Sequence, residues 1–450
     1  MARMKSGRGK CAGLPAGLAG LGSLALVSFT LCAQATFASA LSDHAEEFRH
    51  QLIERVLPYW HDTAQDKDRG GYLLADDLKG RGEAREKQLV SQTRMIWGFA
   101  HAHLHKLGDG QRDYLEAARQ GYRFLLDHFR DREHGGYYWK TDLAGVPIHS
   151  CKFLYGESFV IYALVEYYRA SGDRSALQHA LTLYRDIQRH MHDAERGGWI
   201  EHTEADWRPL APGDPRNEVE VVGYKSANAH LHWMEALAEL CQASRDPDVQ
   251  RSLEEALRIN REYFYPKQPG ASCFHRQADW QPVTAPSSAG LSYGHNVEFA
   301  WLMLRAETVL GRSLSWDHFD AHLDHALRYG YDHEQGGLFY RGSEDQPASD
   351  TTKVWWAEAE MMAALTDALR RGPNPRIEKA LEQLVHFLIE HQIDSRDGIW
   401  LDTLRADGTP LRTGKAHNWK ANYHDVRALV KFVEGCSSRF SPVMIRAPRL

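Results

Sequence analysis

Two histidine motifs about 130 residues apart hold the side chains best suited to chemistry in this sequence. They are Ser292-Tyr-Gly-His295-Asn-Val-Glu298 and Trp419-Lys-Ala-Asn-Tyr-His424. Histidine titrates near neutral pH, so it can accept a proton as a base and return it as an acid. Two imidazoles on opposite sides of a sugar carbon could take a proton from one face and replace it on the other. The pair therefore predicts inversion of configuration at a carbon beside an aldehyde.

Further polar and aromatic groups are spaced so that they support this chemistry. Asn228 and His232 are four residues apart, as are Trp356 and Glu360, and residues at that spacing share a helix face. Proton removal creates an enediolate, which needs electrostatic stabilisation in a site that excludes water, and Arg94 can supply it. We predict the catalytic set His295, His424, His232, Arg94, Glu298 and Glu360, and the substrate-binding set Asn228, Trp356 and Trp419.

A metal site is not predicted. His230 and His232 resemble a ligand pair, but residues two apart on a helix point in different directions. The chain has 25 histidines, so we assign His101, His103 and His105 to structural positions. The proton-transfer scheme needs no metal, nicotinamide or ATP, and we expect no cofactor.

A short motif recurs about every 60 to 75 residues. It consists of an acid, a few polar residues, a glycine pair and an aromatic or apolar residue. Four copies begin at Asp66, Asp131, Asp193 and Asp332, a fifth copy at Asp394 keeps one glycine, and a degenerate sixth lies near Gly270. Repeats of this length cannot bury their apolar faces alone, so they stack into one cooperative unit.

Between these motifs the chain shows pairs of helices. The predicted helices include 94–106 and 113–129, 159–169 and 176–191, and 298–309 and 316–329, with apolar residues at helical spacing. Six helix pairs with short hairpins between them predict an all-α fold, an (α/α)6 barrel of twelve helices. An open superhelix is the alternative, but chemistry near both ends of the chain favours closure. We expect one catalytic domain over residues 41–450.

The first 40 residues have the pattern of a secretion signal. Arg3, Lys5, Arg8 and Lys10 precede an apolar run, and Ala38-Ser39-Ala40 gives a cleavage pattern. The sequence thus predicts a signal peptide at 1–40 and a periplasmic protein, with a retained membrane anchor as the alternative. Removing the four basic residues lowers the net charge from −6 to −10. An acidic chain without a basic patch is a poor partner for nucleic acid or anionic membranes.

Four cysteines follow the predicted cleavage site: Cys151, Cys241, Cys273 and Cys436. They are far apart and contain no CxxC motif. An oxidising compartment permits disulfides, in three possible pairings, and buried thiols are the other interpretation.

At these motifs the chain resembles the N-acylglucosamine 2-epimerase superfamily of sugar epimerases and isomerases. The resemblance runs from Arg94 to His424, with five motifs in the same order, and the superfamily fold is the (α/α)6 barrel. Ser-Tyr-Gly-His295, Lys225-Ser and Asn422-Tyr-His424 are more like cellobiose 2-epimerases than like mannose isomerases. Three features depart from the pattern: Glu358 stands where Gln is common, Ala421-Asn422 replaces Cys-Pro, and residues 209–221 form an insert before Asn228.

The resemblance implies a role for each residue. His232 or a neighbouring residue would assist opening of the sugar ring. His424 and His295 would exchange protons on opposite faces of C2, and the enediolate would rotate about C2–C3 between the two transfers. Arg94 would stabilise the enediolate oxygen, Glu298 and Glu360 would orient and tune the histidines, and Asn228 would position the sugar. Trp356 and Trp419 would stack on it.

The expected function is a sugar 2-epimerase acting on glucose- or mannose-type reducing ends, including β-linked disaccharides such as cellobiose. The protein would bind a mono- or disaccharide and be a monomer or homodimer. Three alternatives stay open: an aldose–ketose isomerase, a glycoside hydrolase using Glu298 and Glu360 as its carboxylate pair, and a binding protein that has lost catalysis.

Overall fold

The computed structural model describes residues 41–74, 84–283 and 290–440. The predicted signal peptide at 1–40 lies outside the described residues. The chain divides into two compact units, Met1–His44 and Ala45–Leu450, and all predicted site residues belong to the second. Within the three described ranges, we find no helix that is both long and apolar enough to cross a bilayer.

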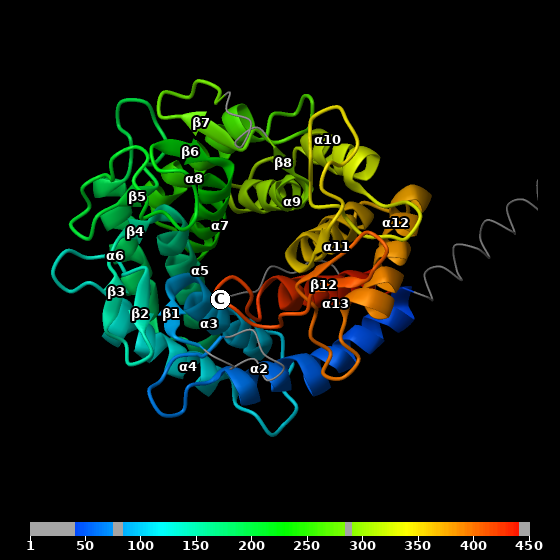
Figure 1. The fold of residues 1–450 in the computed structure, drawn as a ribbon, viewed down its shortest axis with the longest axis horizontal. Coiled ribbons are helices and arrows are strands. Elements are labelled where there is room, and N and C mark those ends of the chain that lie inside the picture. The colour runs from blue at the N-terminus through cyan, green and yellow to red at the C-terminus, as the bar shows by residue number, and fades with distance from the viewer. Residues whose placement is uncertain (1–40, 75–83, 284–289, 441–450) are drawn as a thin grey trace, which may run out of the picture. The chain divides into compact units, whose positions relative to one another are not determined.

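The unit that begins at Ala45 is a closed ring of helix pairs, with six inner helices around the centre and outer helices covering them (Figure 1). The inner helices are α3 (Leu89–Leu104), α5 (Leu154–Ser171), α7 (Ala227–Ser244), α9 (Tyr293–Val309), α11 (Trp355–Leu369) and α13 (His424–Phe440). The outer helices are the segment from residue 45 that includes η1 (Leu52–Val56) and α2 (Leu57–Ala64), then α4 (Tyr114–Phe124), α6 (Arg174–His190), α8 (Pro247–Ile259), α10 (Trp316–His325) and α12 (Pro375–Phe387). Four outer helices continue into π-helical turns: η2 (Leu125–Phe129), η3 (Asn260–Phe264), η5 (Ala326–Gly330) and η6 (Leu388–Gln392).

The ring closes where the start of α13 meets α3. Arg94 Nη1 donates to the Trp419 carbonyl at 2.7 Å, and the Trp97 and Tyr423 rings lie 5.1 Å apart, edge to face. A Cβ atom on Gly98 would come within 2.1 Å of the Asn422 carbonyl oxygen, so only glycine permits this approach. The structure is therefore the predicted (α/α)6 barrel and not an open superhelix.

Burial explains why sequence periodicity predicted the starts of the inner helices too late in the chain. Every residue of α5 from Leu154 to Tyr167 is buried, so the helix has no polar face to produce a 3.6-residue pattern. The helices predicted to begin at Arg94 and Glu298 in fact begin five residues earlier, at Leu89 and Tyr293. The outer helices bury one face only, and their predicted bounds agree more closely with the structure.

Short antiparallel strands join successive repeats. Each inner helix from α3 to α11 follows a strand that pairs with a strand of the next repeat. Two sheets have three strands: β1 (Glu86–Gln88), β2 (Lys140–Asp142) and β3 (Pro147–His149), and β10 (Lys353–Val354), β11 (Thr403–Leu404) and β12 (Pro410–Arg412). Three sheets have two: β4 (Lys152–Phe153) with β5 (His202–Thr203), β6 (Tyr224–Ser226) with β7 (His275–Gln277), and β8 (Leu291–Ser292) with β9 (Arg341–Gly342).

The aspartate of each glycine-pair motif binds a buried lysine, and of these lysines sequence analysis had named only Lys225. Asp66 shows the pattern: Oδ1 accepts from the backbone N–H groups of Asp68 and Arg69, and Oδ2 binds Lys87 at 2.9 Å. Five such lysine–aspartate pairs join neighbouring repeats at 2.8–2.9 Å: Lys87–Asp66, Lys152–Asp131, Lys225–Asp193, Lys353–Asp332 and Lys415–Asp394.

A second contact fixes each motif to the next inner helix. Gln92 Oε1 accepts from the Tyr72 N–H at 2.8 Å, and its amide donates to the Tyr72 carbonyl at 2.9 Å. Glu358 occupies the corresponding place in a later repeat, where its oxygens accept from the Leu338 N–H at 2.9 and 3.0 Å. The presence of Glu358 where Gln is common therefore concerns the contact between a repeat motif and the next inner helix.

Within the described ranges, Cys151, Cys241, Cys273 and Cys436 form no disulfide. The interpretation as thiols holds, with Cys273 partly exposed and the other three buried.

Candidate active site

A cavity of about 710 Å³ opens at the N-terminal halves of the inner helices. Eight of the nine predicted site residues line it: Arg94, Asn228, His232, His295, Glu298, Trp356, Trp419 and His424. The ninth, Glu360, is buried and contacts the cavity residue His424. Closure of the ring therefore brings together residues that are up to 330 positions apart in the chain.

His424 begins α13 and is held by Glu360 of α11. The distance from His424 Nδ1 to Glu360 Oε1 is 2.7 Å. Burial favours the neutral form of Glu360, but Arg427 and His424 outweigh it and lower the pKa of this carboxyl. An ionised carboxylate only accepts hydrogen bonds, so Nδ1 must donate and Nε2 carries the lone pair. Burial also lowers the pKa of His424 to about 3, which keeps the imidazole neutral at physiological pH.

His295 lies on the wall of the same cavity, near the start of α9. Its ring centre is 4.6 Å from that of Trp356, and the His424 ring centre is 6.0 Å from the same indole. Burial lowers the pKa of His295 well below its usual range, and nearby His232 adds to the effect. Two neutral imidazoles from different helices thus border one tryptophan.

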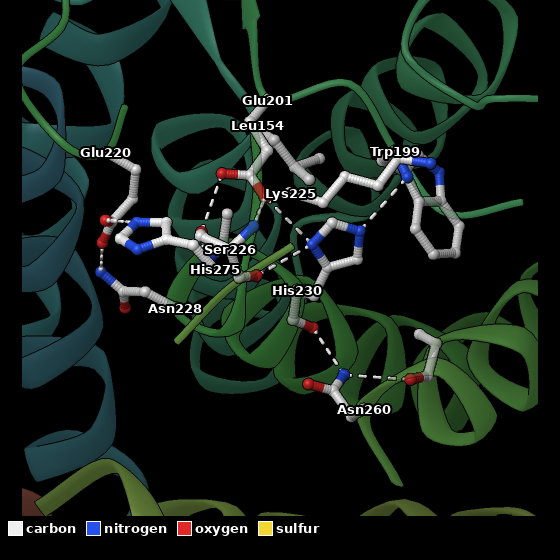
Figure 2. Close-up of polar contacts among 12 residues, drawn as sticks. Leu154, Trp199, Glu201, Glu220, Lys225, Ser226, Asn228, His230, Asn260 and His275 are labelled. Atoms are coloured by element: carbon white, nitrogen blue, oxygen red, sulfur yellow. Dashed lines mark hydrogen bonds and ion pairs between the residues drawn. The ribbon is translucent and has the colours of Figure 1, made fainter. Parts of the chain in front are cut away.

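The two histidines of α7 face different surroundings, as their spacing predicts. His232 lines the cavity, and its Nδ1 lies 2.8 Å from Glu235 Oε2. His230 is buried on the other side of the helix, where it contacts Glu201 at 3.1 Å and accepts the Trp199 N–H at 3.3 Å (Figure 2). His230 therefore fixes a repeat motif and His232 belongs to the site.

Arg427, one turn into α13, lies at the centre of a buried arginine–carboxylate cluster with Glu235, Glu298 and Glu360. Nη1 donates to Glu235 Oε1, and Nη2 donates to Glu298 Oε1 at 3.1 Å and to Glu360 Oε1 at 2.8 Å. The Tyr423 ring lies against the guanidinium at 4.4 Å, a cation–π contact. One guanidinium therefore anchors the carboxylates that hold His232 and His424.

Glu298 differs from the other two carboxyls of this cluster. Burial and the neighbouring charge of Glu360 raise its pKa well above the usual range. Its Oε1 accepts from Arg427, and its buried Oε2 has no hydrogen-bond partner among the described residues. Sequence analysis assigned Glu298 to orienting a histidine, whereas the hydrogen bond it makes is to Arg427. A neutral Glu298 would offer an O–H donor at the cavity wall.

Arg94 and the aromatic residues form another part of the wall. Arg94 Nη2 donates to the Tyr155 hydroxyl at 3.0 Å, and its guanidinium lies 4.5 Å from the Phe159 ring centre. The Trp419 ring is 6.2 Å from that of Tyr155. These contacts orient the arginine and leave Trp356 and Trp419 partly exposed to the cavity.

Asn228, in the first turn of α7, also lines the cavity. Its Nδ2 donates to Glu220 Oε1 at 3.0 Å, and Glu220 Oε2 is 2.8 Å from His275 Nε2 (Figure 2). Glu220 belongs to the 209–221 insert, and both it and His275 line the cavity. The insert therefore contributes to the site.

Only one group of residues has ligand atoms close enough to suggest a cation site within the described ranges. Glu298, Glu360 and His424 each place one ligand atom within 4.8 Å of the others. Arg427 Nη2 already binds both carboxyl groups, and His424 Nδ1 is bonded to Glu360. This arrangement does not fit a resident metal ion, and the cofactor-free scheme stays a prediction.

Sequence analysis missed three residues of the site. Glu235 follows His232 by three positions, a spacing that could have revealed it. Arg427 follows His424 by three positions, but a lone arginine in an amphipathic stretch resembles a surface residue. Glu220 lies in an insert whose place over the cavity depends on the fold. The catalytic roles of six predicted residues and the substrate-binding roles of the other three remain predictions, although the structure brings all nine together.

A family model for N-acylglucosamine 2-epimerase (GlcNAc 2-epimerase) matches residues 70–428 of this chain. The chain belongs to the N-acylglucosamine 2-epimerase family. Its sequence is 29% identical over 400 residues to a cellobiose 2-epimerase of Bacteroides fragilis, covering 86% of this chain and 98% of that protein. It is 24% identical over 394 residues to a D-mannose isomerase of Marinomonas mediterranea, covering 85% and 96%.

The structure agrees with this assignment. A solved cellobiose 2-epimerase from Spirochaeta thermophila superposes with a TM-score of 0.80 at 29% identity, covering 90% of this chain and 99% of the other. The family and the barrel fold predicted from the five motifs are thus confirmed. As an N-acylglucosamine 2-epimerase family member, the protein is an enzyme of the carbohydrate epimerase and isomerase class.

Proposed function

We propose that this protein is a sugar 2-epimerase that interconverts glucose- and mannose-type reducing ends through an enediolate. One observation carries the proposal: the neutral imidazoles of His295 and His424, from separate helices, border the same Trp356 ring in one cavity. Epimerisation needs a proton acceptor on one face of C2 and a proton donor on the other. The family assignment supports the same conclusion.

The surrounding residues suit each step of this reaction. His232, with Nδ1 bonded to ionised Glu235, presents Nε2 as a base that can assist ring opening. One of the catalytic histidines then takes the C2 proton, and the electron pair moves onto the C1 carbonyl to give the enediolate. After rotation about C2–C3, the other histidine, which takes up a proton from solvent to become an imidazolium, donates that proton to the opposite face. The first histidine releases the C2 proton to solvent, and the order reverses with the epimer bound. Arg94 and a neutral Glu298 are placed to stabilise the enediolate oxygen.

The arginine–carboxylate cluster argues against the hydrolase alternative. A glycoside hydrolase places its two carboxyl groups on either side of the scissile bond. Here Arg427 Nη2 binds both Glu298 and Glu360, so a guanidinium occupies the place between them. Glu360 is bonded to His424 behind the cavity wall, where it cannot reach a glycosidic oxygen.

An aldose–ketose isomerase remains the second candidate, because the chain also matches a D-mannose isomerase. Both reactions share the enediolate: a proton returned to C2 gives the epimer, and a proton returned to C1 gives the ketose. The cellobiose 2-epimerase relatives favour the first, and we further propose β-linked disaccharides such as cellobiose as substrates. We also propose a periplasmic location, from the basic and apolar pattern of residues 1–40.

Proton NMR in heavy water tests the proposal. The protein without residues 1–40 would be incubated with cellobiose, mannobiose, glucose and mannose in turn. The expected result is an anomeric signal of the C2 epimer with deuterium at C2. A ketose product would establish the isomerase, and monosaccharides released from cellobiose would establish a hydrolase. An unchanged spectrum with every sugar would refute the proposed substrates.

A further inference from the structure

The side chain of Glu220 bridges two residues on the cavity wall. Its Oε1 accepts from Asn228 Nδ2 at 3.0 Å, and its Oε2 is 2.8 Å from His275 Nε2 (Figure 2). The side chain is 10% exposed, so bulk water competes little for these bonds. Both carboxylate oxygens therefore have fixed partners before any ligand arrives.

This arrangement decides which end of the Asn228 amide is taken up by Glu220 and which end is left without a partner. A carboxylate only accepts hydrogen bonds, whereas an amide has one donor end and one acceptor end. Glu220 can therefore bind only Nδ2, which turns Oδ1 away from it. That oxygen is buried and has no hydrogen-bond partner among the described residues, although Asn228 lines the cavity. An unpaired buried acceptor is costly, and a ligand hydroxyl would satisfy it.

The position of Glu220 is itself fixed by the fold. His275 lies on β7 directly opposite Ser226 of β6, two residues before Asn228. Within the insert, Asn217 Nδ2 donates to the Glu220 carbonyl at 2.9 Å. Glu218 ties the same loop to β2 through Lys140 at 2.6 Å. The insert is thus held where it can align Asn228.

We propose that Glu220 is a positioning residue that presents Asn228 Oδ1 as a hydrogen-bond acceptor for one hydroxyl group of the sugar. The inference rests on the proposed function, because it takes the ligand to be a sugar. Glu220 acts through Asn228 and exchanges no proton with the substrate. Recognition of this hydroxyl depends on the orientation of the Asn228 amide. Its Oδ1 must accept from the sugar while its Nδ2 donates to Glu220.

Swapping the two groups tests this dependence. His275 Nε2 donates to Glu220, so in Glu220→Gln the new oxygen stays with His275 and the new NH2 group faces Asn228. This draws Asn228 Oδ1 toward the glutamine and away from the sugar. In Asn228→Asp, two carboxylates face each other. We expect each single variant to raise KM about tenfold, the effect of one hydrogen bond worth about 1.4 kcal/mol. In the variant that carries both substitutions, the introduced amide can donate to the introduced carboxylate, whose second oxygen still accepts from the sugar. KM should then return to within about threefold of the original value.

A matched control separates this pairing from a general effect of charge. Glu218→Gln combined with Asn228→Asp removes the same charge from the same loop, but Glu218 binds Lys140 and His149 and not Asn228. We expect no recovery of KM in this control. A swapped double variant no better than the single variants would overturn the inference, as would Glu220→Gln with a KM within twofold of the original.

A second measurement uses the unaltered chain, in case a variant does not fold. Inhibition constants of monodeoxy analogues of the substrate should identify one hydroxyl whose removal weakens binding about tenfold. Analogues that all bind within twofold of the parent sugar would refute a hydroxyl donor to Asn228. Turnover by the unaltered protein is measured first: its absence counts against the proposed function, whereas turnover without recovery in the swapped variant counts against the role of Glu220 alone.

Discussion

Replacing Glu358 by glutamine should make the barrel more stable at alkaline pH. Burial raises the pKa of this carboxyl from 4.5 to about 8, although it accepts the Leu338 N–H. Glu358 is therefore protonated in the folded chain and ionised in the unfolded chain between these pH values, so the folded state binds the extra proton. Its contribution to stability is complete below pH 4.5 and is lost as the pH rises toward 8.

The size of the effect follows from the two pKa values. A tenfold change in proton affinity is worth about 1.4 kcal/mol, so the full loss amounts to about 5 kcal/mol above pH 8. About 3 kcal/mol of that loss falls between pH 6 and pH 9. An unfolding entropy of about 2 cal/mol/K per residue over roughly 400 residues converts this into a melting-temperature difference on the order of 3 °C.

Glutamine fits the position because Gln92 makes the same contact in the first repeat, with its oxygen accepting and its amide donating to the Tyr72 backbone. Calorimetric melts of the original protein and Glu358→Gln at pH 6, 7, 8 and 9 should therefore diverge, with the variant losing less. Glu157→Gln should behave alike, since burial raises the pKa of Glu157 to about 8 as well. Glu133→Gln, with a side chain 83% exposed, is the control. Melting curves that stay parallel for Glu358→Gln would show that this carboxyl is ionised in the folded state.

The remaining predictions concern the site. His295→Ala and His424→Ala should each lower kcat at least about 10³-fold with near-normal melting temperatures; deuterium incorporation by NMR measures this, and near-normal turnover would exclude the two-histidine scheme. Trp419→Ala should raise KM about tenfold with a small change in stability, as initial rates and melts would show, because the indole contributes binding surface. Arg427→Met should lower the free energy of unfolding by about 3–5 kcal/mol in urea titrations, since it leaves buried carboxylates without their counter-charge. Since burial lowers the pKa of His424 to about 3, its protonation should not reduce kcat/KM between pH 5 and 7; a loss centred near pH 6.5 would contradict the burial argument.

The residues that carry the proposed chemistry were predictable because their types and spacing are unusual. His295, His424 and Trp356 stand in short motifs that can be recognised from their residue types and from their order along the chain. The bonds among their supporting groups were not predictable, because they join distant segments: Arg427 reaches Glu235 from 192 positions away and Glu298 from 129. Which carboxyl stays ionised depends on that geometry.

The fold was predictable where burial leaves a pattern. Outer helices have one buried face and show it in sequence, whereas inner helices such as α5 are buried on every side and show only their length and their flanking strands. The lysine–aspartate pairs were missed for another reason. A single lysine before a helix resembles a surface residue, and only the structure shows that Lys87 is 1% exposed.

The lysine–aspartate pairs bear on how the chain assembles. Four of the five join residues 21 positions apart, and the third spans 32 because it includes the insert, so each can form soon after its segment leaves the ribosome. The seam between α3 and α13 is different, since Arg94 and Trp419 are 325 positions apart. Bringing together residues that are so far apart in the chain costs the most loop-closure entropy. We therefore expect the early repeats to fold during synthesis, while the cavity stays incomplete until the last inner helix arrives with His424 and Arg427.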